Sequence, residues 1–103
     1  MIGIRMMDLK RWRGFSLREQ IGHITSEIAR AKGWQERNDL ASCNRALQRA
    51  LDLLDLTLDC YSHSRRRELA RFKEMVCHCL AQSNLYRVTL EDLERFGLSH
   101  VAA

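Results

Sequence analysis

Cysteine and histidine side chains, the usual ligands of zinc, cluster at two places in this sequence. The candidates are Cys60, His63, Cys77, His78 and Cys79. Successive residues of a helix point about 100° apart, so Cys77 and Cys79 would face nearly opposite sides of a helix. No Cys-x-x-Cys pair accompanies them. We therefore expect no metal site and interpret Cys43, Cys60 and Cys79 as small hydrophobic core residues.

Arginines form two groups whose guanidinium ions could bind phosphate or another anion. Arg11 and Arg13 flank Trp12, and the second group comprises Arg65, Arg66, Arg67 and Arg71. A net charge of +4 and a pI near 9.2 permit attraction to nucleic acid, to anionic lipid or to an acidic protein. Trp12 could stack on bases, but an aromatic side chain that folds back onto the core is the commoner arrangement.

The second arginine group stands where a helix should begin, which is locally unfavourable. The positive end of the helix dipole repels cations, so another interaction must stabilise these side chains. Asp55, Asp59 and an external anion are the candidate partners.

Three carboxylates at helical spacing, Asp52, Asp55 and Asp59, could converge on a divalent cation. With so many arginines nearby, salt bridges or plain solvation are the better interpretation. The sequence has no Ser-His-Asp or Cys-His arrangement, no glycine-rich phosphate loop and no dinucleotide fingerprint. We predict no catalytic residue and no cofactor.

Arg18 and His23 stand five residues apart with the polar Glu19 after the arginine. This Arg-x4-His spacing resembles the motif of ribonucleases in the higher-eukaryote-and-prokaryote nucleotide-binding family, which are small helical bundles. The resemblance implies RNA cleavage by Arg18 and His23, although that family places its motif late in the fold. On a straight helix the two side chains would point about 140° apart, so they could converge only across a dimer or a kink.

One flank of the first long helical segment has almost no side-chain bulk. It consists of Gly22, Ser26, Ala29 and Gly33, which recur at helical spacing. Such a flank allows another helix to approach closely, and we predict an interaction surface here. The neighbouring ridge of His23, Glu27, Arg30 and Trp34 is interpreted as a solvated face with a tryptophan at the core edge.

The segment from Leu40 to Tyr61 predicts a long central helix. Its apolar residues span an arc of roughly 180°, wider than the stripe of a surface helix, and a polar band broken only by Leu56 fills the rest. Leu40 and Leu54 belong to the apolar arc. A helix of this kind requires neighbours on more than one side.

Capping residues mark where the other helices begin. Ser16 and Glu19 form a capping box, and Ile21, Ile24, Ile28 and Ala31 then give an apolar stripe. Asn38 or Asp39 can cap the central helix. Ser62 or Ser64 can cap a third helix to about Ser83, whose core face carries Leu69, Phe72, Met75, Val76, Cys79 and Leu80. Thr89 and Asp92 open a short last helix over 90–96 that ends at a left-handed Gly97.

These patterns predict an all-α protein: a compact antiparallel bundle of three main helices plus a short fourth C-terminal helix. With 103 residues, 46% of them hydrophobic, and no proline, the chain suits one domain of uninterrupted helices. We expect an irregular basic arm over 1–15, the bundle over 16–98 and a frayed tail over 99–103.

The sequence lacks an apolar signal segment and any apolar run long enough to cross a bilayer, so we expect a cytoplasmic, bacterial-type protein without membrane contact. We predict a non-catalytic module that binds a protein partner, with a homodimer as one form. The alternatives are a nucleic-acid-binding protein and a small ribonuclease-like bundle.

Overall fold

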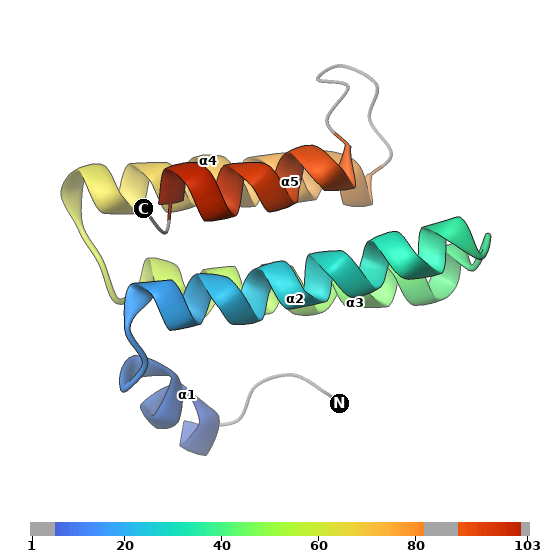
Figure 1. Cartoon of the computed structure of the whole chain (residues 1–103). Helices are drawn as coiled ribbons and strands as arrows, with labels where there is room; N and C mark the ends of the chain where they lie inside the picture. Colours follow the sequence, from blue (N-terminus) through green and yellow to red (C-terminus); the bar gives the residue numbers. More distant parts are fainter. Residues whose placement is uncertain (1–5, 82–88, 102–103) are drawn as a thin grey trace.

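The computed structural model describes residues 6–81 and 89–101, and these residues form helices and no strand (Figure 1). The elements are α1 (Met6–Arg13), α2 (Leu17–Glu36), α3 (Leu40–Leu58), α4 (His63–Leu80), α5 (Leu90–Phe96) and the π-helical turn η1 (Gly97–Val101). Helices α2 and α3 form an antiparallel hairpin, α4 and α5 lie over it as a second layer, and α1 lies beside the start of α2 (Figure 1). The predicted all-α bundle is confirmed.

Side-chain caps begin the helices largely where the sequence predicts them. The Ser16 hydroxyl accepts from the Glu19 backbone N–H at 3.1 Å, and the Glu19 carboxylate accepts from the Ser16 N–H at 2.8 Å. Thr89 and Asp92 form the same reciprocal box at the start of α5. Asp39 caps α3 by accepting from the Ser42 N–H, whereas the Ser62 side chain makes no capping hydrogen bond to α4.

Helix α3 supplies much of the core, as its broad apolar arc predicts. Leu54 is fully buried, and the predicted stripe of α2 and the centre of the α4 face are buried with it. Two leucines differ from the prediction. Leu40 belongs to the apolar arc but is 52% exposed; it is the first residue of α3, at the end of the hairpin. Leu56, placed in the polar band, is half-buried and packs against the core.

The predicted irregular N-terminal arm is wrong for residues 6–13, which form helix α1. An eight-residue helix is too short to be stable by itself in water, so tertiary packing must hold it. Trp12 supplies that packing, because its side chain is only 5% exposed within the core.

The frayed tail predicted over 99–103 is wrong for residues 99–101, which continue the chain after α5 as η1, while 102 and 103 lie outside the described residues. Gly97 is right-handed, with φ −60°, and does not terminate the helix as predicted. A Cβ at Gly97 would lie 2.9 Å from Phe72 Cζ and 3.0 Å from Thr25 Cγ2. Glycine is therefore needed here for close packing and not for a left-handed turn. The predicted end of α4 at Ser83 also lies outside the described residues.

Within the described ranges, no helix combines the length and apolar character that crossing a bilayer requires.

The central position of α3 is tested by truncating two of its leucines. Leu54→Ala should lower the free energy of unfolding by about 2–5 kcal/mol, because it removes buried methyl groups and leaves a cavity. Leu56→Ala should cost clearly less, since Leu56 is half-buried. Urea unfolding of both variants measures the difference, and equal losses would contradict the orientation of α3.

Candidate functional site

A chain of buried polar contacts holds one end of the bundle together. The Trp12 indole N–H donates to the Thr57 hydroxyl at 3.0 Å, which joins α1 to α3. The Gln20 side-chain amide, 1% exposed, donates to the Trp12 carbonyl at 2.9 Å and accepts from the Tyr61 hydroxyl at 3.0 Å. These four side chains, Trp12, Gln20, Thr57 and Tyr61, are called the polar link below. The polar link ties α1, α2, α3 and the connection to α4 to one another.

Burial changes the interpretation of the first arginine group. Arg11 and Arg13 are exposed, but the Trp12 ring between them points into the core and contacts Phe15 at 5.8 Å and His23 at 5.6 Å between ring centroids. Base stacking on Trp12 is therefore wrong for this structure. The commoner alternative, an aromatic side chain that folds back onto the core, is what the structure shows.

The second arginine group is exposed at the start of α4 and does not use the carboxylates suggested for it. Asp55 pairs with Lys73 at 2.6 Å. Arg66 donates to the backbone carbonyl of Leu58, the last residue of α3. The negative end of the α3 dipole thus offsets part of the unfavourable charge at the start of α4. Arg65, Arg67 and Arg71 are exposed and form no ion pair with another described residue.

The polar link brings the two arginine groups to the same end of the molecule. Tyr61 lies two residues before α4, and its hydroxyl donates a hydrogen bond to Gln20. The Gln20 amide in turn donates to the carbonyl of Trp12, in the last turn of α1. Burial raises the pKa of Tyr61, and the charge of nearby Arg65 opposes that shift. Figure 1 shows α1, the start of α2, the end of α3 and the start of α4 on one side of the molecule. We call the exposed arginines there the basic end: Arg11, Arg13, Arg18, Arg65, Arg66 and Arg67.

Arg18 is a member of the basic end that the predicted anion-binding set lacks. It is exposed in the first turn of α2. In the sequence it follows Arg13 by five residues, so its membership of the N-terminal group of cations was the available signal. Arg71, which was in the predicted set, lies one helical turn beyond Arg67 on α4.

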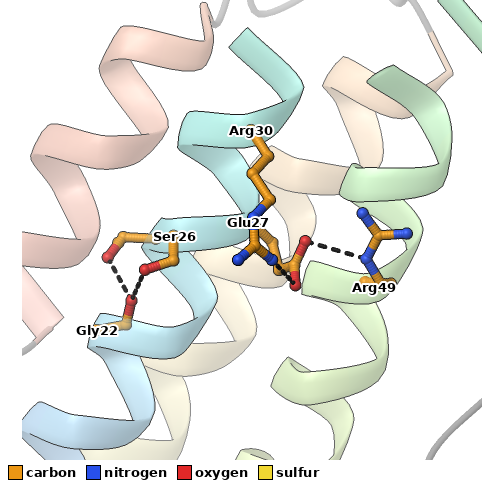
Figure 2. A network of polar contacts seen from close by, with 6 residues as sticks. Gly22, Ser26, Glu27, Arg30 and Arg49 are labelled. Carbon is orange, nitrogen blue, oxygen red and sulfur yellow. Dashed lines mark hydrogen bonds and ion pairs between the residues drawn. The ribbon is translucent and has the colours of Figure 1, made fainter. Parts of the chain in front are cut away.

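The small-residue flank of α2 is open. Ser26 and Ala29 are exposed, and a Cβ built on Gly22 or Gly33 would meet no atom within 4 Å. The Ser26 hydroxyl donates to the Gly22 carbonyl at 2.9 Å, so it is turned onto its own helix (Figure 2). Helix α3 covers one side of α2, and α5 with η1 covers another.

The predicted solvated ridge beside this flank also takes part in a contact between two helices. The Glu27 carboxylate, 13% exposed, accepts from Arg30 at 2.9 Å and from Arg49 of α3 at 3.0 Å (Figure 2). The contact with Arg49 connects α2 to α3, whereas the contact with Arg30 lies within α2. Arg37 places its guanidinium 5.2 Å from the centroid of the Trp34 ring.

The described residues contain no group of three or more side chains placed to hold a metal ion. All four cysteines are thiols; Cys43 is buried and Cys77 is exposed. Burial raises the pKa of the Cys43 and Cys79 thiols, which suits their interpretation as core residues.

The Arg-x4-His pair is not brought together within the chain. Arg18 and His23 belong to the continuous helix α2, which keeps their directions about 140° apart. The His23 ring lies 5.0 Å from Phe15 between centroids, so it packs beside α1. The structure offers no geometric support for the ribonuclease-like alternative.

Comparison with known proteins finds no matching family model, no matching curated protein and no matching solved structure.

Replacing the amide of the polar link should destabilise the protein. Gln20→Leu keeps a side chain of similar size but leaves the Tyr61 hydroxyl and one acceptor site of the Trp12 carbonyl without their partner. We expect the free energy of unfolding to fall by about 1–3 kcal/mol. The matched control is Gln48→Leu on α3, where the exposed amide bonds only Asp52, with an expected change within about 0.5 kcal/mol. Equal effects of the two substitutions in urea unfolding would show that the polar link is not structural.

Proposed function

We propose that this protein is a non-catalytic helical module that acts by binding another protein, a second copy of itself in the first instance. The flank formed by Gly22, Ser26, Ala29 and Gly33 carries this proposal. It remains uncovered although α2 is packed against α3, α5 and η1. Residues without bulk contribute little to a core, but they allow two helix backbones to approach closely.

Two further features favour the flank as a contact surface. The Ser26 hydroxyl is satisfied within its own helix, so burying the flank would not strand that donor. Leu98, one of the two large hydrophobic residues exposed in the described chain, follows Gly97, whose backbone lies against Thr25 next to the flank. A partner helix could therefore cover small residues and an exposed leucine together.

The chemistry of the cysteines supports a reducing compartment, and we place the protein in the cytoplasm as part of this proposal. All four are thiols, as is usual for cytosolic proteins.

Sedimentation of the purified protein tests self-association. Wild type should sediment as a dimer, and Ala29→Leu as a monomer, because a bulky side chain on the flank would separate the helices. Ala41→Leu is the matched control: it enlarges another exposed alanine, on α3, and should leave the dimer intact.

The proposal fails if wild type and Ala29→Leu both sediment as monomers with stabilities within about 0.5 kcal/mol of each other, the range typical of an ordinary surface substitution.

A further inference from the structure

We propose that the basic end binds the phosphate backbone of double-stranded nucleic acid without reading its bases. This inference is independent of the protein-binding function proposed for the α2 flank. It assigns a second surface, formed by residues from α1, α2 and α4.

The polar link makes the basic end one surface. Trp12 bonds Thr57 and anchors the last turn of α1, which carries Arg11 and Arg13. Gln20 lies one turn after the start of α2 and bonds both the Trp12 carbonyl and Tyr61. Residues separated by about fifty positions in the sequence thus present their charges at the same end of the bundle (Figure 1).

The arginines of the basic end are not neutralised within the described part of the chain. The ion pairs found there lie elsewhere and involve Glu27, Asp55, Asp92 and Glu94. The carboxylates with described side chains at this end are Glu19, which caps α2, Asp59 and Glu68, and they are outnumbered by the six arginines and the exposed Lys10. The excess of positive charge remains available to an external anion.

Arginine is the cation best suited to phosphate, because its planar guanidinium can donate two parallel hydrogen bonds. Of the 17 lysines and arginines, three are lysines, Lys10, Lys32 and Lys73, which leaves fourteen arginines. In the turns that carry the basic end, Lys10 of α1 is an exposed lysine beside the six arginines, so arginine predominates there.

The aromatic side chains at this end favour a duplex over a single strand. Proteins that bind single strands stack bases on exposed aromatic rings. Here Trp12 is buried, the Tyr61 hydroxyl is bonded to Gln20, and Phe15 is half-buried against Trp12 and His23. Phosphate contacts alone remain, and these fix a protein on a duplex without sequence information.

An anionic membrane fits the surface less well. Membrane-surface binding usually combines cations with exposed apolar side chains. The large hydrophobic residues exposed in the described chain are Leu40, at the far end of the α2–α3 hairpin, and Leu98 of η1. Leu40 is therefore remote from the arginines. Helix η1 lies against α4, toward the side where α4 begins (Figure 1), so Leu98 is a single exposed leucine outside the turns that carry the arginines.

The experiment measures the affinity of the full chain for a mixed-sequence DNA duplex two turns long, by fluorescence anisotropy across a series of salt concentrations. If all six arginines contact phosphates, the logarithm of the binding constant should fall against the logarithm of salt with a slope of about −5. Arg11→Gln with Arg13→Gln, and separately Arg65→Gln with Arg67→Gln, should each reduce that slope by about two. Each pair should also weaken binding about tenfold or more near 0.1 M salt.

The matched control is Arg37→Gln with Arg45→Gln, which removes the same charge at the opposite end of the α2–α3 hairpin. It should leave the slope nearly unchanged; an equal effect would overturn the assignment to the basic end.

Tighter binding to the single strand of the same sequence would overturn the proposal that the ligand is a duplex. Binding to vesicles of anionic lipid, or to a polyglutamate chain, without binding to the duplex would overturn nucleic acid as the partner. All four test arginines are exposed, so thermal unfolding should match wild type. If one double variant fails to fold, the salt slopes of the other double variant and of Arg18→Gln test the proposal.

Discussion

The indole N–H of Trp12 and the hydroxyl of Thr57 form the contact on which the arrangement of this protein depends. A buried indole that lacked an acceptor would carry an unpaired donor, so Trp12 can enter the core only where Thr57 meets it. Thr57 in turn donates to the Leu53 carbonyl within α3. Gln20 adds a second set of contacts, because its buried amide donates to the Trp12 carbonyl and accepts from the Tyr61 hydroxyl. Among the described buried side chains, none has a polar atom without a partner.

This constraint determines where charge accumulates. Docking α1 through Trp12 leaves Arg11 and Arg13 exposed beside the turn that leads into α4, where three arginines follow one another. Bringing like charges to one end has an electrostatic cost. Part of it is offset by the contact of Arg66 with the carbonyl end of α3, and the rest is reduced by solvent. The α2 flank, in contrast, carries no charge, and its neighbours Lys32 and Glu94 pair with each other.

Local signals in the sequence predict the helices that they begin, and little about how distant segments meet. The Ser16 and Thr89 capping boxes and the wide apolar arc of α3 act within a few residues, so α2, α3 and α5 could be predicted. Helix α1 could not, because its stability comes from one tryptophan that packs against a residue 45 positions away. Gly97 was misinterpreted because its role is set by Phe72 and Thr25 across the bundle. The candidate surfaces follow the same pattern. The flank of α2 lies on one helix and could be predicted from its spacing. Both arginine groups could also be found in the sequence, but their meeting at one end of the molecule follows only from the fold.

Hydrogen exchange of the two tryptophan indole N–H groups, followed by NMR, tests most directly whether α1 is held by the buried Trp12. Trp12 is 5% exposed and bonded to Thr57, whereas Trp34 is half-buried near the end of α2. The indole N–H of Trp12 should exchange more slowly than that of Trp34, by a factor of about 100 or more, because it is released only when α1 undocks. Equal exchange rates for the two groups would contradict the docking of α1 and, with it, the single basic end.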